Sequence, residues 1–401
     1  MFLIGLIREG KVPADNRVAL TPKQCRWIQQ NLHDIKIVVQ PCINRCFSNK
    51  EYHSAGIELR EDLGECDLLL GIKEVPVDIL LMGKKYMFFS HTKKEQPHNQ
   101  KLLQTIVEKK ITLIDYECLE HEDGQRILGF GFFAGIVGAH NGMWAYGKRT
   151  GAYELCRVGE CKDYRQLINT YFGLKLPPIK IAVTGSGRVA SGILEIMNLM
   201  DIIEVEPDEF LQREFSYPVY VHLKGQDLYK HKQTGKYNRN DFHNNPGNYS
   251  SKFKPYIYQS DILMNGTCWE KNIPALFRWE DMLNNDFRIK TIADISSDTE
   301  GGVPCNVGSS TIEFPIYGVD PTSRQMIDPY QKGGVDIMAI SNLPNELPRD
   351  ASSYFGDQLI KYILDEIRKD ESPVIERATI VKEGKLTNNY LYLKEYAEGQ
   401  L

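Results

Sequence analysis

The chain has 401 residues, of which 42% are hydrophobic and 25% are charged, a composition typical of globular proteins that contain more than one hydrophobic core. Its formal net charge of −5 gives no general attraction to nucleic acid or to an acidic membrane, because both partners require a dense basic surface. We therefore expect two folded domains and neither of these partners.

The N-terminus starts with a short apolar run that no basic segment precedes, which predicts a strand rather than a signal peptide. No apolar stretch approaches the roughly 20 residues that cross a bilayer. We expect a cytoplasmic protein. Its nine cysteines are scattered and lack the spacing of a zinc site, so we expect reduced thiols and no metal.

The first third of the chain alternates short apolar runs with helical patterns. Strands are predicted at 2–7, 35–40, 68–72, 86–90 and 111–116. A helix is predicted to begin after Thr21, where threonine suits the N-cap and Pro22 suits the first helical position. This alternation predicts a parallel sheet that is covered by helices on both faces.

Two neighbouring strands each end beside a titratable residue, Lys73 after the first and His91 after the second. The carboxyl ends of strands in an α/β sheet form the crevice where ligands bind, so both side chains are candidates for one site. A lysine and a histidine suit proton transfer at an amine or imine, provided that burial and nearby positive charge lower the pKa of the lysine. Taken singly, each is more often a solvated strand end or a structural histidine.

A dinucleotide-binding pattern opens the second half of the chain. A strand from residue 179 leads into Gly185-Ser186-Gly187-Arg188-Val189-Ala190 and then into a helix that ends near residue 200. Such glycines permit a tight turn and close approach of backbone N–H groups to a pyrophosphate. The alternative is a glycine turn without a ligand. The candidate cofactor residues are Gly185, Gly187, Arg188, Val189, Ala190, Glu206 for the ribose hydroxyls, and Asn265 and Asp294 at the ends of later strands.

These patterns predict an α/β protein with two Rossmann-like domains, parallel sheets and an active site in the cleft between the domains. Residues 129–148 read as a glycine-rich helix that leaves the first domain, and the helical pattern at 351–369 is expected to pack back on it. We therefore predict a discontinuous substrate domain, 1–140 plus 325–401, and a dinucleotide-binding domain at 141–324.

The segment 222–258 is rich in lysine, asparagine, tyrosine and glycine and has little hydrophobic periodicity. A basic and aromatic patch for nucleic acid is one interpretation. A solvated excursion is favoured, because Asp227 and Asp241 interrupt the positive charge.

The chain as a whole resembles the lysine-forming saccharopine dehydrogenases, also called lysine–2-oxoglutarate reductases, and more distantly alanine dehydrogenase. The N-terminal half carries this resemblance in RVALTP, GIKEVP, FSHTKKEQ, LIDYECL and RILGFGFFAGIVGA. The later segments look like the reductase half of the bifunctional lysine-degrading enzyme: AVTGSGRVASG, VEPDEF, NYSSKFKPY, MNGTCWE, ADISSDTEGG and LPRDASSYFGDQL. These segments occur in order along nearly the whole chain.

The resemblance implies one reaction, in which saccharopine, NAD(P)⁺ and water give L-lysine, 2-oxoglutarate and NAD(P)H. A single reaction is expected because the chain ends where the bifunctional enzyme continues. Lys73 resembles the base that deprotonates the secondary amine, and His91 the acid–base group for water attack on the imine. The residues implied in substrate binding are Arg17 for a carboxylate, Glu74, Gln96, Glu117 and Arg126.

Four cations and one acid are expected to set the pKa of Lys73. The cations Arg17, Lys93, Lys94 and Arg126 would bind the three carboxylates of saccharopine and lower this pKa, whereas Glu74 would raise it.

The choice between NAD and NADP stays open. Glu206 and Asp208 would repel a 2′-phosphate unless Arg188 or Lys224 compensates, so charge favours NAD while the resemblance favours NADP. The alternative functions are an alanine dehydrogenase-like enzyme and a catalytically silent NAD(P)-binding protein. A homo-oligomer is compatible with the sequence, which fixes no oligomeric state.

Overall fold

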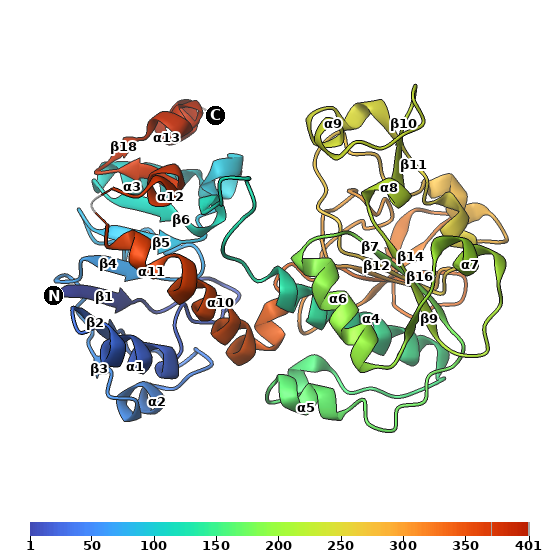
Figure 1. Ribbon diagram of the computed structural model, residues 1–401, viewed down its shortest axis with the longest axis horizontal. Coiled ribbons are helices and arrows are strands. Elements are labelled where there is room, and N and C mark those ends of the chain that lie inside the picture. Colours follow the sequence, from blue (N-terminus) through green and yellow to red (C-terminus); the bar gives the residue numbers. More distant parts are fainter. Residues whose placement is uncertain (370, 400–401) are drawn as a thin grey trace. The chain divides into compact units, whose positions relative to one another are not determined.

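The computed structural model describes residues 1–369 and 371–399, which form two compact units (Figure 1). The first unit combines Met1–Phe130 with the chain from Pro348 onward, and the second is Gly131–Leu347. The chain thus passes from the first unit to the second between residues 130 and 131 and returns between residues 347 and 348. The sequence predicted these boundaries at 140/141 and 324/325. The second crossing comes later because the strands between 317 and 338 pair with the second sheet.

The first unit is built on one eight-stranded sheet in the order β18-β17-β6-β5-β4-β1-β2-β3. Its strands are β1 (Phe2–Leu6), β2 (Ile35–Val39), β3 (Glu58–Leu59), β4 (Leu68–Leu70), β5 (Lys85–Phe88), β6 (Thr112–Asp115), β17 (Thr379–Lys382) and β18 (Lys385–Leu386). The neighbouring strands β6, β5, β4, β1, β2 and β3 are parallel, as predicted, and β17 and β18 add an antiparallel edge.

The helices of the first unit are α1 (Pro22–Asn31), α2 (Asn49–Ser54), α3 (Gln100–Glu108), α10 (Pro348–Tyr362), α11 (Leu364–Ile367), α12 (Pro373–Ala378) and α13 (Lys394–Glu398). Helix α1 begins as predicted, because the Thr21 hydroxyl accepts the N–H of Gln24 and the Gln24 side chain accepts the N–H of Thr21. Phe355 and Leu359 of α10 are fully buried in the same core as the N-terminal strands. In Figure 1, helix α10 is orange and these strands are blue. The first domain is therefore discontinuous, as predicted.

The second unit has its own eight-stranded sheet in the order β15-β14-β16-β13-β12-β7-β9-β8. Its strands are β7 (Lys180–Thr184), β8 (Ile203–Glu204), β9 (Val219–Leu223), β12 (Ile262–Asn265), β13 (Thr291–Asp294), β14 (Tyr317–Asp320), β15 (Gln325–Ile327) and β16 (Val335–Met338). Its helices are α4 (Gly131–Thr150), α5 (Tyr164–Asn169), α6 (Arg188–Leu199), α7 (Pro207–Gln212), α8 (Gly225–Leu228) and α9 (Arg239–Asn244). The neighbouring strands β8, β9, β7, β12, β13 and β16 are parallel, and β14 and β15 are antiparallel additions.

Helices α4 and α6 pack at very short range because both carry glycine at the crossing. A Cβ atom on Gly192 of α6 would lie 2.0 Å from the carbonyl oxygen of Phe132, and one on Gly135 of α4 would lie 2.0 Å from that of Val189. The two helix backbones are therefore in direct contact, which fixes the start of α6 within the second unit.

A small packed lobe follows β9, contrary to the expected solvated excursion. Its hairpin pairs β10 (Tyr229–His231) with β11 (Tyr249–Ser251). Tyr229 and Tyr249 of this hairpin and Phe242 of α9 are buried. The rings of Tyr229 and Phe242 stack with centroids 4.6 Å apart. Aromatic contacts thus replace the aliphatic periodicity that the sequence lacks.

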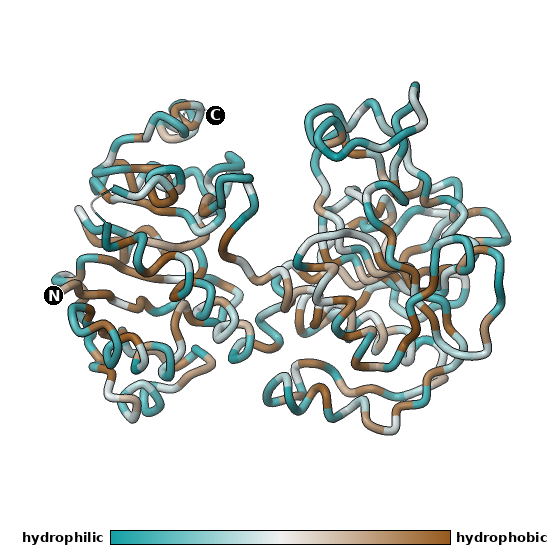
Figure 2. Tube along the Cα trace, viewed as in Figure 1, coloured by the Kyte–Doolittle hydropathy of each residue, from teal (hydrophilic) through white to brown (hydrophobic). Residues whose placement is uncertain are grey.

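Hydrophobic residues follow the central strands of each sheet, while the connecting loops are mostly hydrophilic (Figure 2). Within residues 1–369 and 371–399, the structure contains no helix with the length and apolar character of a membrane span.

Candidate active site

The carboxyl ends of β1, β4, β5 and β6 bring polar side chains to one edge of the first sheet. Strands β4 and β5 are parallel neighbours in which Leu70 pairs with Met87. Lys73 and His91 each follow three residues after the last residue of their strand. The matched strand ends place both side chains at this edge.

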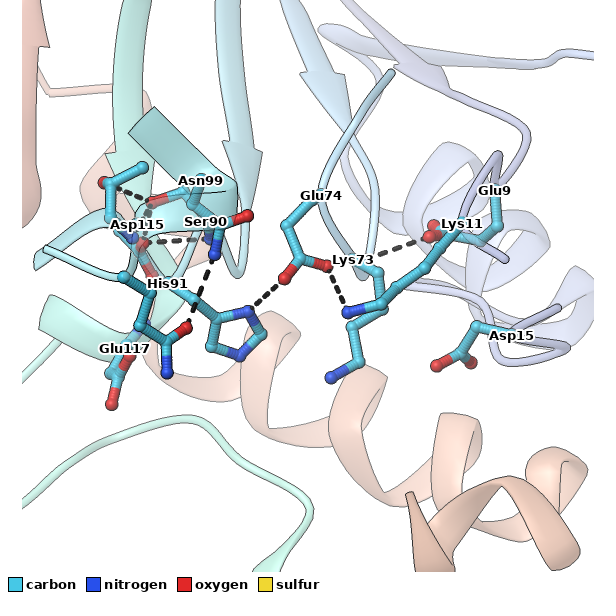
Figure 3. Close-up of polar contacts among 12 residues, drawn as sticks. Glu9, Lys11, Asp15, Lys73, Glu74, Ser90, His91, Asn99, Asp115 and Glu117 are labelled. Carbon is cyan, nitrogen blue, oxygen red and sulfur yellow. Dashed lines mark hydrogen bonds and ion pairs between the residues drawn. The ribbon is translucent and has the colours of Figure 1, made fainter. Parts of the chain in front are cut away.

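The Glu74 carboxylate joins His91 to Lys11, a residue that the sequence analysis did not single out. Its Oε1 lies 2.6 Å from Nδ1 of His91, and its Oε2 accepts a 2.8 Å hydrogen bond from Nζ of Lys11. Figure 3 shows the carboxylate between the two groups. Burial raises the pKa of Glu74, but the contacts with His91 and Lys11 outweigh it and hold this pKa at about 2. Glu74 is thus ionised across the neutral range.

Lys73 is half-buried beside this network. Burial, followed by the positive charges of Arg17 and Lys11, lowers its pKa to about 8, while Glu74 opposes the shift. A substantial fraction of Lys73 is therefore neutral near pH 8 and can accept a proton. The predicted effects of Arg17 and Glu74 on this pKa are confirmed in direction.

The structure assigns other roles to the three remaining cations that were expected to act on Lys73. Lys93 faces Glu120 at 4.0 Å, and Arg126 donates a 2.9 Å hydrogen bond to Glu117. Lys94 contributes, with Arg126, to the lowered pKa of Glu117. Lys11 takes their place near Lys73 because it follows β1, the strand next to β4.

His91 has a left-handed backbone conformation, with φ of 52°, which is uncommon for a residue with a side chain. An ionised carboxylate only accepts hydrogen bonds, so the contact with Glu74 places a proton on Nδ1. In the neutral ring Nε2 is then the basic nitrogen. Phe89 stacks on the ring with centroids 6.2 Å apart and supports its orientation.

Asp115, at the end of β6, anchors the segment that carries His91. This fully buried carboxylate accepts the backbone N–H of Ser90 at 3.0 Å, the Ser90 hydroxyl, and the backbone N–H of Glu117 at 2.7 Å. It therefore fixes the residue before His91 together with Glu117. Burial raises the pKa of Asp115 while these donors oppose the shift.

Glu9 anchors Lys73 in the same way from the end of β1. Its two carboxylate oxygens accept the backbone N–H groups of Ile72 at 2.6 Å and Lys73 at 2.9 Å. Burial raises the pKa of Glu9 to about 7. Glu9 and Asp115 were both missed in the sequence, although Glu9 lies three residues beyond its strand, as Lys73 and His91 do, and Asp115 is the last residue of its strand. The strand-end signal could therefore have found both.

Arg17 is buried and forms a bidentate ion pair with Asp15. Its Nε and Nη2 donate to the two carboxylate oxygens at 2.9 and 2.6 Å, and its guanidinium carbon lies 4.1 Å from the centre of the Phe130 ring. Burial raises the pKa of Asp15, but the Arg17 charge outweighs it and lowers this pKa to about 2. The guanidinium is thus held in one orientation.

Glu117 is a buried carboxylate with one oxygen directed to Arg126 and a second oxygen, Oε2, that has no hydrogen-bond partner in the described part of the chain. Burial raises its pKa, and the charges of Arg126 and Lys94 outweigh this and lower it. Gln96, by contrast, contacts Asn99 through its side chain and Tyr396 through its carbonyl oxygen.

The glycine loop of the second unit fits a dinucleotide pyrophosphate. Gly185 has φ of 109°, and a Cβ there would lie 2.6 Å from the carbonyl oxygen of Gly266. A Cβ on Gly187 would meet nothing within 4 Å, and no side chain caps α6 at this position. The backbone N–H groups of the first turn, at Arg188, Val189 and Ala190, are therefore oriented to bind an anion.

Glu206 does not follow the strand whose end meets the adenosine ribose in a dinucleotide-binding sheet. The ribose lies at the end of the strand next to β7, and in this sheet that strand is β9. Strand β8 pairs with β9 at the edge of the sheet, and Glu206 lies two residues beyond β8 as an exposed residue. Lys224 follows β9 instead. The strand order, which depends on pairing between distant segments, is the reason for the difference.

Asn265 and Asp294, the other predicted cofactor residues, are fully buried at the ends of β12 and β13. Nδ2 of Asn265 donates to Asp294 at 2.8 Å, its Oδ1 accepts from Thr184 at 2.8 Å, and Asn306 donates to the second Asp294 oxygen at 2.7 Å. We infer that these side chains shape the loops around the cofactor rather than contact it. Among the described residues, no three His, Cys, Asp or Glu side chains are grouped to hold a metal ion.

Comparison with known proteins gives relatives along nearly the whole chain. Residues 5–137 match the family described as "Alanine dehydrogenase/PNT, N-terminal domain". Alpha-aminoadipic semialdehyde synthase of Mus musculus is 30% identical over 99% of this chain, which spans about half (48%) of that relative's length. Saccharopine dehydrogenase [NAD(+), L-lysine-forming] of Yarrowia lipolytica is 25% identical, over 93% of this chain and 94% of its own.

Two solved structures share the fold. An L-alanine dehydrogenase aligns with a TM-score of 0.66 and 14% identity over 100% of this chain and 99% of its own. A transhydrogenase from Sinorhizobium meliloti aligns with a TM-score of 0.61 and 13% identity over 96% of this chain and 100% of its own. Both confirm the predicted α/β fold with two Rossmann-like domains. The resemblance drawn from the sequence is therefore confirmed: over nearly its whole length the chain is similar to proteins named saccharopine dehydrogenase and alpha-aminoadipic semialdehyde synthase.

Proposed function

We propose that this chain is a nicotinamide-dependent oxidoreductase that interconverts saccharopine and water with L-lysine and 2-oxoglutarate. The observation that carries the proposal is the ionised Glu74 that bridges His91 and Lys11 beside a lysine with a pKa of about 8. An amine base and an oriented imidazole are the two groups that oxidation of a secondary amine and hydrolysis of the resulting imine require. The named relatives support this reaction class.

Lys73 acts as the base toward the secondary amine of saccharopine. In its neutral form Nζ removes the amine proton, so that the nitrogen lone pair is available as the C–H bond beside it breaks. Burial and the charges of Arg17 and Lys11 keep this neutral form accessible near pH 8. The hydrogen bonds from the Glu9 carboxylate hold the Lys73 backbone during this step.

His91 acts on the imine that oxidation leaves on the substrate. Its Nε2 takes a proton from the attacking water and passes that proton to the nitrogen that leaves with lysine. As the C–N bond of the carbinolamine breaks, Nε2 takes the hydroxyl proton and the carbonyl group of 2-oxoglutarate forms. Glu74 fixes the ring and stabilises its positive charge between these transfers. Lysine and 2-oxoglutarate are the products of that cleavage.

The remaining charged residues bind the substrate. Oε2 of Glu117 is a buried acceptor suited to the substrate ammonium group. Arg17 and Arg126 are suited to its carboxylates, with Arg17 held rigid by Asp15. Glu74 and Gln96 complete the substrate residues in this proposal.

NAD(P) supplies a hydride acceptor for the amine carbon and a donor in the reverse direction. The loop at Gly185–Ala190 would hold its pyrophosphate. The activity therefore requires both units of the chain.

The test is a cofactor-oxidation assay with L-lysine and 2-oxoglutarate, each alone and both together, with NADH and with NADPH. Oxidation only when both substrates are present supports the proposal. Turnover with pyruvate and ammonia instead would assign the chain to alanine dehydrogenase chemistry. Tight cofactor binding without turnover of any amino acid and oxo acid pair would leave a catalytically silent NAD(P)-binding protein.

A further inference from the structure

We propose that Lys224 binds the 2′-phosphate of NADP and makes this chain selective for NADP(H) over NAD(H). The inference rests on the proposed function only in taking a nicotinamide dinucleotide as the cofactor. It starts from the order of the strands in the second sheet, which the sequence pattern did not reveal.

The residue after the strand beside β7 meets the adenosine ribose in a dinucleotide-binding sheet. Here that strand is β9, in which Leu223 pairs with Thr184, the last residue before the glycine loop. The backbone N–H of Gly185 donates to the carbonyl oxygen of Leu223 at 3.0 Å. Lys224 therefore comes directly beside the glycine loop.

The competing residue, Glu206, is one strand further from the loop. Strand β8 reaches β9 at the level of Tyr220, where Glu204 is its partner, and the chain enters α7 at Pro207. Adjacent strands are about 4.8 Å apart, so the end of β8 lies about 4.8 Å further from β7 than the end of β9 does. An acid after β8 is poorly placed for the ribose hydroxyls.

The backbone at Lys224 is fixed while its side chain is exposed. Its N–H donates to Oδ2 of Asp227 at 2.9 Å, and its carbonyl oxygen accepts the N–H of Asp227 at 2.8 Å. The ring of Tyr237 covers the next residue so closely that a Cβ on Gly225 would lie 2.4 Å from the Tyr237 hydroxyl oxygen. The carboxylate of Asp227, the nearest acid in sequence, is thus engaged by the backbone.

Two further features favour an anionic ligand here. His222 on β9 contacts the carbonyl oxygen of Gly185 through Nε2 at 2.7 Å, which ties β9 to the glycine loop. The segment 224–258 carries seven basic and two acidic residues, although the whole chain has a net charge of −5. The lobe that continues from Lys224 is therefore electropositive, which suits a phosphate.

The test is equilibrium binding of NADPH and of NADH to the full chain, followed by fluorescence without any amino acid or oxo acid. The wild type is expected to bind NADPH at least tenfold more tightly than NADH. Lys224→Ala should weaken NADPH binding roughly 10- to 100-fold and change NADH binding less than threefold, because only NADPH carries the phosphate. Lys224→Asp should reverse the preference.

Two variants serve as matched controls. Lys230→Ala removes another exposed lysine of the same lobe and should preserve the NADPH preference. Glu206→Gln should leave NADH binding unchanged. Competition by 2′,5′-ADP and by 5′-ADP isolates the contribution of the 2′-phosphate, because only the first compound carries it. Lys224→Ala should weaken the binding of 2′,5′-ADP and leave that of 5′-ADP unchanged. Retained NADH binding shows that each variant is folded.

Equal or tighter NADH binding by the wild type would overturn the inference, as would an equal loss of both cofactors in Lys224→Ala. A more than tenfold loss of NADH binding in Glu206→Gln would return the ribose site to Glu206. No substrate is present, so a chain that prefers NADPH but fails to couple lysine with 2-oxoglutarate would refute the proposed reaction and leave this inference standing.

Discussion

Removing either partner of the Lys11–Glu74 ion pair should move the pH dependence of saccharopine oxidation, in opposite directions. Lys73 must be neutral to act as a base, so kcat/KM should rise with pH through its pKa of about 8. Lys11→Met removes a positive charge that lowers this pKa, so the rising limb should move to higher pH. Glu74→Gln removes a negative charge that raises it, so the limb should move to lower pH.

The magnitude follows from the partial burial of the site. Lys11 and Glu74 retain 36% and 13% exposure of their side chains, so each charge is only partly screened. One unit charge near a half-buried site couples by roughly 1 kcal/mol, which is about 0.7 pKa unit. The two variants should therefore differ by about 1.4 pH units in the position of the limb. Glu74 has a pKa of about 2 and is ionised throughout the assay.

The assay is the initial rate of NAD(P)H formation from saccharopine at subsaturating substrate between pH 6 and about 10. Lys23→Met, an exposed lysine on α1, is the control and should leave the limb in place. Glu74→Gln should also lower the maximal rate, because His91 loses its orienting carboxylate. Shifts in the same direction, or no shift in either variant, would refute the assignment of Lys73 as the titrating base.

Four further substitutions test the rest of the site. Asp15→Asn removes the carboxylate that forms the bidentate ion pair with the buried Arg17 guanidinium, so urea unfolding at pH 7 should show a loss of about 3–5 kcal/mol in the free energy of unfolding. The folded-state pKa of Asp15 is about 2, below its ordinary value of 3.8, so the stability that the ion pair contributes is fully present above about pH 4. The difference in unfolding free energy between wild type and Asp15→Asn should therefore narrow as the pH falls toward 2. A difference that stays constant with pH would contradict the ion pair. Glu117→Gln should raise KM for lysine roughly 10- to 100-fold with a smaller change in kcat, and an effect confined to 2-oxoglutarate would reassign the residue. Lys73→Met and His91→Gln should each reduce turnover roughly 10²–10⁴-fold while cofactor binding persists, and wild-type rates in both would exclude their proposed roles.

Features that depend on local sequence were predictable. Thr21 and Pro22 mark a helix start because capping involves only the next three residues, and the structure has the capping box there. The glycine loop at Gly185 was recognised because its strand–turn–helix setting is contiguous. Lys73 and His91 were found from one rule, that parallel strands deliver polar residues to a shared edge.

Features that depend on pairing between distant segments were not predictable in the same way. Glu206 was expected at the ribose because β8 directly follows α6 in sequence, but β9 inserts between β8 and β7. Likewise, the burial of Asp294 depends on Asn265 and Asn306, which reach it from other parts of the unit. Register and strand order arise from tertiary contacts that a single sequence does not display.

The anchors of the site illustrate a middle case. Glu9 and Asp115 lie at strand ends that the sequence does mark, yet only the structure reveals that their carboxylates bind backbone N–H groups next to Lys73 and His91. A carboxylate that supports a neighbouring residue has the same local pattern as one that binds substrate. Partners, rather than position along the chain, distinguish the two roles.

The most direct test of the central claim is to follow the ε-nitrogen of lysine into the product. L-lysine labelled with ¹⁵N at the ε position is incubated with 2-oxoglutarate, reduced cofactor and the full chain, and the products are analysed by mass spectrometry. The proposed reaction predicts that saccharopine forms in proportion to the cofactor oxidised and retains the label in its secondary amine. Label that appears in glutamate, or cofactor oxidation without a product containing both carbon skeletons, would contradict it.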